Sequence, residues 1–229
     1  MVNNSDWSPG PFAPNSVVSL FGSNLSFSDA TVVSASSMNG DMLPTQLGGV
    51  SVLEDNSPAP LLYVDKGQIV FLVPSTEIAG TSTIQVVRQS IAGPAVTITL
   101  VTAAPALFAS NGYALAQDYN NSYTAVTPNT PAQTGDMIVL YATGLGYTQP
   151  RSLPGEVAAT AATVAAAVQV LLNGAAIDSK LIYYAGVTPG CAGLYQINFI
   201  MPGGFSGDTE IRVSAAGQTS AAGLKIAIR

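Results

Sequence analysis

Short apolar runs separated by turn-forming residues recur along the whole chain. Within Ala95–Val101, the apolar residues Val96, Ile98 and Leu100 alternate with threonines. Period-two alternation places apolar side chains on one face of a β-strand. The first half is predicted to contain strands at Val17–Phe21, Val50–Leu53, Leu61–Val64, Ile69–Val73, Thr83–Val87 and Ala95–Val101. The second half is predicted to contain strands at Ile138–Tyr141, Val168–Leu172, Leu181–Tyr184, Tyr195–Ile200, Glu210–Ser214 and Leu224–Ile228.

Turn formers fill the gaps between these runs. Gly22-Ser23-Asn24 and Asp55-Asn56-Ser57-Pro58 each follow a predicted strand. Asn173-Gly174 favours the left-handed backbone angles of a tight hairpin. The chain has 15 prolines and 22 glycines, which leave little room for long helices. The pattern therefore predicts an all-β protein.

An internal repeat is visible in three blocks that occur twice in the same order. Val17–Leu25 aligns with Met137–Leu145, Leu61–Val64 with Leu181–Tyr184, and Gln68–Pro74 with Gln196–Pro202. Six or seven short strands per copy are typical of an immunoglobulin-like β-sandwich. In the first block we expect Val18 and Leu20 to face the core. We expect the following Gly22 to let the chain turn out of the sheet.

The repeat predicts two tandem sandwich domains, with a boundary near Thr102–Pro105. The division is a tail at 1–10, a first domain at 11–104 and a second domain at 105–229. The second copy carries an insertion at about 151–166, roughly Arg151 to Ala166. Its alanine content permits a short helix, and a loop is the alternative.

Composition restricts the classes of function. Hydrophobic residues make up 48% of the 229 residues and charged residues 9%, with seven Lys plus Arg and a net charge of −6. No basic cluster is present, which argues against nucleic-acid binding and against a polybasic membrane tether. No apolar run approaches the length of a spanning helix, so we expect no membrane insertion. The N-terminus lacks a signal peptide, and we interpret the chain as an excised fragment with Met1 added.

Several motifs together resemble a known family. They are Leu47–Val52, Ala59–Val64, Gly67–Ile69 with Val73-Pro74, Val139–Gly146 and Gly193–Asn198. This set is similar to an uncharacterised C-terminal domain family of acidobacterial (Solibacter-type) exported proteins, from about Pro14 to the end of the chain. The strand followed by Gly22–Leu25 also resembles the start of TIG-type immunoglobulin-like domains, a TIG/E-set-like fold. The resemblance implies an extracellular or cell-surface module at the C-terminus of a larger bacterial protein, and it implies no activity.

Candidate catalytic chemistry is sparse. The chain has no histidine, so neither a serine nor Cys191 has the commonest general base. Glu54 and Asp55 are adjacent carboxylates, as a carboxylate-dependent hydrolase would need, but a hairpin turn explains them equally well. Gly144-Leu145-Gly146 lacks the third glycine of a dinucleotide loop and is interpreted as a strand-ending turn. We therefore expect no enzyme activity and no cofactor.

Loop oxygens and loop aromatics are the remaining candidates. Asp118–Asn121 and Glu54–Asn56 offer hard oxygen ligands, but without the alternating acidic spacing of a calcium loop, so we expect no metal. Tyr119 and Tyr123 flank a polar loop that a carbohydrate could contact, with simple exposure of the two rings as the alternative. The function hypotheses are a non-catalytic module for adhesion, presentation or spacing, a carbohydrate-binding module, and a carboxylate-dependent hydrolase. The expected partners are a surface polysaccharide or another protein.

Overall fold

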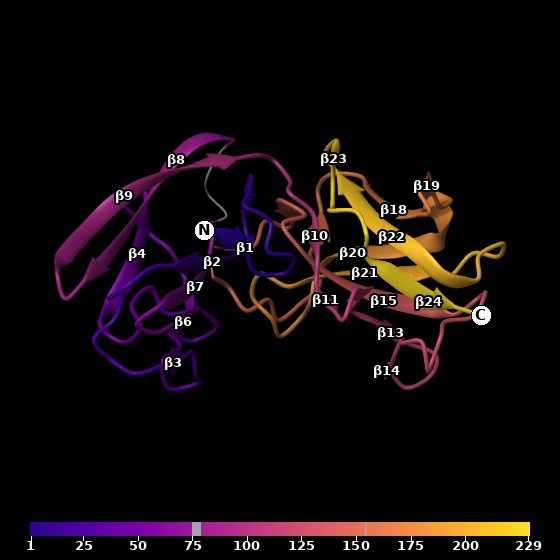
Figure 1. Ribbon diagram of the computed structural model, residues 1–229, viewed down its shortest axis with the longest axis horizontal. Coiled ribbons are helices and arrows are strands. Elements are labelled where there is room, and N and C mark those ends of the chain that lie inside the picture. Colours follow the sequence, from indigo (N-terminus) through magenta and orange to yellow (C-terminus); the bar gives the residue numbers. More distant parts are fainter. Residues whose placement is uncertain (75–78, 154) are drawn as a thin grey trace.

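The computed structural model describes residues 1–74, 79–153 and 155–229 (Figure 1). These residues form β-strands and one short 3-10 helix, η1 (Ser179–Leu181). The strands pair almost entirely antiparallel, in sheets that enclose apolar cores as β-sandwiches do. The prediction of an all-β fold is confirmed.

The N-terminal half (residues 1–104) contains two sheets that face each other. The five-stranded sheet has the order β1-β2-β7-β6-β3 and the four-stranded sheet the order β5-β4-β8-β9. Their bounds are β1 (Val2–Asn3), β2 (Val17–Phe21), β3 (Thr31–Val32), β4 (Val50–Glu54), β5 (Ser57–Pro58), β6 (Leu61–Val64), β7 (Gln68–Leu72), β8 (Gly80–Arg88) and β9 (Ile91–Leu100). The core cluster between them includes Val18, Leu20, Phe71 and Ile84. Val18 and Leu20 face this core as expected, because alternate side chains of a strand point to the same side.

The C-terminal half (residues 105–229) also contains two sheets, and each has more strands than those of the N-terminal half. One has the order β14-β13-β15-β21-β20-β17-β16, with β10 also paired to β15, and the other β11-β12-β24-β22-β18-β19, with β23 paired to β22. The bounds are β10 (Ala106–Leu107), β11 (Ala109–Ser110), β12 (Tyr113–Ala114), β13 (Ala116–Asp118), β14 (Thr124–Ala125), β15 (Met137–Thr143), β16 (Thr148–Gln149), β17 (Thr163–Val164), β18 (Val168–Leu172), β19 (Ala175–Ala176), β20 (Ile182–Val187), β21 (Tyr195–Ile200), β22 (Gly207–Ala215), β23 (Gln218–Thr219) and β24 (Lys225–Ile228). Each predicted strand overlaps one of those found.

The internal repeat extends to the pairing register. Leu20 of β2 pairs with Ile69 of β7, and the aligned Leu140 pairs with the aligned Ile197. A register irregularity also occurs at the same place in β6 and β20. The alignment of Leu61–Val64 with Leu181–Tyr184 is therefore wrong by one residue, because Tyr63 occupies the position of Tyr184 and not of Tyr183.

Two local expectations are also corrected. The left-handed residue after β2 is Asn24 (φ 56°), which aligns with Gly144 (φ 72°), so the turn does not depend on Gly22. Asn tolerates this conformation better than most residues because its side chain bonds locally. Among the described residues of the 151–166 insertion, the only regular element is β17, and the helical alternative is wrong. The Asn173-Gly174 hairpin is confirmed, with φ of 48° and 79°.

Main-chain hydrogen bonds join the two halves. The Ala104 amide donates to the Gly144 carbonyl at 2.8 Å, and the Leu43 amide donates to the Gly155 carbonyl at 2.9 Å. The Thr143 hydroxyl accepts from the Val17 amide at 3.1 Å. Figure 1 shows the two halves side by side along the longest axis. Because bonds cross residue 104 in this way, the division into two domains at that residue stays a prediction.

Candidate functional site

The outer face of the sheet containing β13, β15, β21 and β20 carries a group of polar and aromatic side chains. Along β21, Tyr195, Ile197 and Phe199 are buried in the core. Gln196 and Asn198 alternate with them and therefore face outward. The register places Tyr141 opposite Gln196, and places Gln117, Val139, Asn198 and Tyr184 in one row across four strands.

Tyr119 and Tyr123 form the exposed end of this face. Each side chain is 51% exposed, and the rings make an edge-to-face contact with centroids 5.1 Å apart. The loop that holds them is ordered by its polar residues. Asn120 Oδ1 accepts from the Met137 amide at 2.7 Å, and Asp118 Oδ1 accepts from the Asn120 amide at 3.0 Å. The sequence prediction of an exposed tyrosine loop is thus confirmed, while its ligand remains a prediction.

Tyr141 continues the aromatic surface toward the centre of the sheet. Its hydroxyl donates to Gln117 Oε1 at 2.6 Å. Partial burial raises the pKa of Tyr141, and the nearby Tyr123 hydroxyl and Cys191 thiol raise the pKa further. Tyr119, Tyr123 and Tyr141 therefore lie in succession from the loop onto the sheet.

Tyr184 lies on the same face across two strands. A Cβ placed on Gly186 would come 2.6 Å from Cζ of the Tyr184 ring, so the ring packs over the bare glycine backbone. The Tyr184 hydroxyl donates to the Val187 carbonyl at 2.7 Å. Because Gly186 has no side chain, the ring can lie along the sheet with its other side turned away from it. Burial also raises the pKa of Tyr184.

An amide pair occupies the middle of this face. Gln196 Nε2 donates to Asn198 Oδ1 at 3.2 Å. The remaining polar atoms of the pair are therefore one acceptor, Gln196 Oε1, and one donor, Asn198 Nδ2. We call the outward-facing residues Gln117, Tyr119, Tyr123, Tyr141, Tyr184, Gln196 and Asn198 the tyrosine face.

The opposite sheet of the same half has a different outer surface. Along β22, the charged residues Asp208, Glu210 and Arg212 alternate with buried Thr209, Ile211 and Val213. Lys225 of the neighbouring strand adds an exposed ion pair with Asp208 at 3.4 Å. The tyrosine face is composed of uncharged residues, so charge and aromatic surface are separated between the two sheets.

The N-terminal half covers its counterpart of the tyrosine face. There the outward residues Val17, Val70 and Leu72 pack with Leu43 and Met38 in a small apolar cluster. Val70 occupies the position of Asn198, and Leu72 that of Ile200. The same sheet position is therefore apolar in one half and polar and aromatic in the other, and Leu72 is buried where Ile200 is partly exposed.

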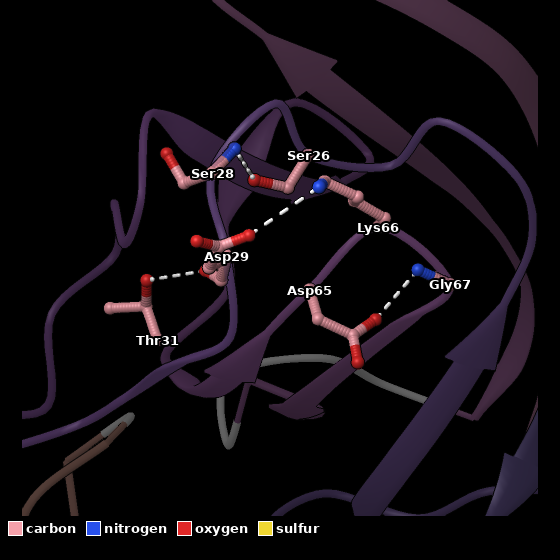
Figure 2. Close-up of polar contacts among 7 residues, drawn as sticks. All are labelled: Ser26, Ser28, Asp29, Thr31, Asp65, Lys66 and Gly67. Atoms are coloured by element: carbon pink, nitrogen blue, oxygen red, sulfur yellow. Dashed lines mark hydrogen bonds and ion pairs between the residues drawn. The ribbon is translucent and has the colours of Figure 1, made fainter.

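A polar turn in the N-terminal half brings two carboxylates and a lysine together (Figure 2). Lys66 Nζ lies 3.4 Å from Asp29 Oδ1, and both side chains are largely exposed. Asp65 accepts from the Gly67 and Gln68 amides at 2.6 Å. The hydrogen bond from the Tyr63 hydroxyl, together with these amide bonds, lowers the pKa of Asp65. These contacts order the turn, and an exposed ion pair of this kind contributes little free energy.

An apolar hollow lies beside the β8–β9 hairpin. Its volume is about 460 Å³, and it is lined by Leu20, Ile84, Val86, Ile91 and Val96 among others. The lining is mainly apolar. Nothing in the described residues indicates which molecule would fill it.

The other sequence candidates do not converge on a site. Glu54 is fully buried whereas Asp55 is exposed in the hairpin, so the two carboxylates do not face each other in a cleft. Cys191 is an exposed free thiol. Gly144 and Gly146 belong to the junction between the halves. Across the described ranges, no group of three or more metal-ligating residues is present.

The sequence missed most of the tyrosine face. Tyr183 and Tyr184 are both in a strand, and both are expected to be core or half-buried, but Tyr183 is 67% exposed. Gln117 lies in no motif, and the motif that contains Tyr141 does not mark it as a surface residue. In each strand, the residues that alternate with the core residues face outward, and this pattern could have identified Tyr141 and Gln117 as outward-facing. Placing them on one face also requires the pairing register between the strands.

Comparison with known proteins adds no function. No family model matches the chain, and no curated protein matches it. The solved structures that match include SGBP-B from a complex xyloglucan utilization locus in Bacteroides uniformis, with 10% identity, a TM-score of 0.28, and coverage of 93% of this chain and 46% of that one. Domains 4 and 5 of the S-layer protein SbsC match with 12% identity, a TM-score of 0.20, and coverage of 79% and 76%.

A mouse coronavirus receptor-binding domain complexed with its murine receptor matches with 13% identity, a TM-score of 0.22, and coverage of 96% and 89%. The chain spans less than half the length of the SGBP-B structure. Likeness at this level carries no inference about activity or ligand. Separately, no helix in the described part of the chain is long and apolar enough to cross a membrane.

Proposed function

We propose that this chain is a non-catalytic module of a larger exported bacterial protein that acts in adhesion, presentation or spacing at the cell surface. The observation that carries the proposal is the main-chain-bonded junction between the two β-sandwich halves. A spacer or presenting module must hold its ends at a fixed distance, and a junction made of backbone hydrogen bonds restricts hinge motion.

The junction has features that side-chain contacts alone would not provide. A Cβ on Gly144 would lie 2.2 Å from the Ala104 carbonyl oxygen, so the two backbones are in direct contact. The Val157 amide donates to the Asp41 carbonyl at 2.8 Å, which fastens a second point of the same junction. Two separated attachment points resist bending better than one, and this supports a stiff unit.

The experiment is a measurement of ¹⁵N relaxation on the purified chain. Amides in both halves are expected to report one rotational correlation time and one common diffusion tensor. Two distinct correlation times would mean that the halves tumble independently, and the spacer function would then be rejected. Retention on isolated bacterial cell walls tests adhesion separately, since a chain that is stiff but not retained has only the spacing role.

A second candidate function is carbohydrate binding, favoured by the exposed Tyr119–Tyr123 pair. Tyrosine rings bury apolar area and also offer a polar tip, which suits the mixed surface of a sugar. Replacing both residues with alanine is expected to weaken binding to any glycan that the chain retains. Unchanged affinity in this double variant would remove the loop from the proposal.

A further inference from the structure

We propose that the tyrosine face is a single extended binding site for a neutral polysaccharide chain. This inference rests on the second candidate function and enlarges its site from one loop to the breadth of the sheet. The carrying observation is that the register brings Tyr141 and Tyr184 to one face together with three side-chain amides. Tyr123 lies near Tyr141, and its ring contacts that of Tyr119.

The spacing of the rings suits a chain of sugars. Gln196 lies between Tyr141 and Gly186, the glycine that carries the Tyr184 ring. Adjacent strands are about 4.8 Å apart, so Tyr141 and Tyr184 are separated by roughly 10 Å. The path from β14 to β20 crosses four such intervals, or about 19 Å. This length fits an oligosaccharide segment better than a single sugar.

Two of the rings are held in place before any ligand arrives. Tyr141 is fixed by its 2.6 Å bond to Gln117, and Tyr184 by its 2.7 Å bond to the Val187 carbonyl. A fixed ring loses little conformational entropy on binding. The Tyr184 ring is backed by Gly186 and is partly exposed, and the proposed site uses its exposed part for stacking against a sugar ring.

The polar groups specify a neutral ligand. Amide side chains offer paired donors and acceptors that match vicinal hydroxyl groups. The Gln196–Asn198 pair presents one of each, between the two held rings. The residues of the tyrosine face include no carboxylate to repel an acidic glycan and no basic group to attract one. By contrast, β22 of the opposite sheet carries both acidic and basic side chains. A phosphorylated or uronic-acid polymer therefore has no counter-charge on this face.

The corresponding position of the N-terminal half is packed differently. There the segment containing Met38 and Leu43 packs with Val70 and Leu72, and Leu72 is 1% exposed. In the C-terminal half, Ile200 replaces Leu72 and is partly exposed, and the polar Asn198 replaces Val70.

The test is affinity gel electrophoresis of the full chain through soluble polysaccharides. The probes are mixed-linkage β-glucan, hydroxyethylcellulose and galactomannan as neutral polymers, and polygalacturonate as an acidic one. We expect retardation by at least one neutral polymer and none by polygalacturonate. Tyr184→Ala is expected to lower affinity about tenfold, as is Tyr123→Ala, because each loses a stacking surface.

Tyr113→Ala is the matched control. Tyr113 is a half-exposed tyrosine of the other sheet whose hydroxyl bonds Asp208, and its loss should leave retardation unchanged. Thermal unfolding of each variant checks that the fold persists, and Tyr184→Phe, which keeps the ring, should retain binding.

The outcomes separate the two proposals. Loss of retardation in Tyr123→Ala but not in Tyr184→Ala would leave sugar binding at the loop and overturn the extended site. No retardation by any neutral polymer would overturn both. Preferential retardation by polygalacturonate would overturn the neutral ligand.

Discussion

The Val17 amide donates a hydrogen bond of 3.1 Å to the Thr143 hydroxyl, which joins the first residue of β2 to the last residue of β15. These two strands are the matched opening strands of the internal repeat. The same hydroxyl donates to the Gly193 carbonyl at 3.0 Å. One buried side chain thus satisfies main-chain groups from both halves, and it provides a single point at which the junction can be tested.

Thr143→Val is expected to destabilise the protein by about 1–3 kcal/mol, because the Val17 amide and Gly193 carbonyl lose a partner while staying buried. Valine has nearly the same shape as threonine, so packing is little changed. Thr143→Ser keeps the hydroxyl and is expected to lose less. Urea unfolding of the three proteins measures the difference. Equal stability of Thr143→Val and the parent chain would show that the bond does not contribute.

Gly144→Ala and Gly174→Ala form a matched pair. Both glycines have left-handed φ, at 72° and 79°. A Cβ at 144 would lie 2.2 Å from the Ala104 carbonyl oxygen, whereas one at 174 meets nothing within 4 Å. Each change costs about 1–2 kcal/mol for the backbone conformation, and Gly144→Ala is expected to cost about 1–3 kcal/mol more for the clash.

Free energies of unfolding from urea titrations give this comparison directly. If the two variants lose the same stability, the close approach of the two backbones at the junction is wrong.

Tyr195 should make the protein less stable at high pH. Burial raises the pKa of Tyr195 in the folded state, and its hydroxyl donates to the Gly146 carbonyl at 2.6 Å. The unfolded chain therefore loses this proton from about pH 10 upward while the folded chain keeps it. Because the folded state then binds more protons, stability falls as pH rises above about 10.

Tyr195→Phe removes this titration, so the free energy of unfolding should fall less steeply with rising pH. Chemical unfolding at several pH values from 8 to the alkaline limit gives both profiles. Parallel profiles for the parent chain and Tyr195→Phe would exclude Tyr195 as a source of the alkaline sensitivity.

Asp65 should make the stability of the protein depend on pH in the acid range. The Tyr63 hydroxyl and two backbone amides lower the pKa of Asp65 in the folded state. Its stabilising contribution is complete above the unfolded pKa of about 4 and is lost as pH falls through the folded value. Asp65→Asn can still accept the turn bonds but does not titrate, so its stability should fall less between pH 5 and acid conditions. An identical acid profile would assign the sensitivity to other carboxylates.

The sequence by itself determined the strands, the order of the repeat and the exposed tyrosine loop. Alternation in Ala95–Val101 and the Asn173-Gly174 turn depend on residues that are neighbours in the chain, so their physical causes are local. Alternation also determined which face of β2 is buried, but not its register with β7, because a slip of two residues keeps the same side chains inward.

Only the tertiary structure decided which surfaces meet and which stay accessible. Tyr141 and Tyr184 are 43 positions apart, and they share a face only because β15, β21 and β20 pair in one register. The irregularity in β20 sets the outward position of Tyr184, and no local pattern encodes it. In the N-terminal half, the segment containing Met38 and Leu43 packs against Val70 and Leu72 of β7. That segment is distant from β7 in the sequence, so only the fold decides the contact.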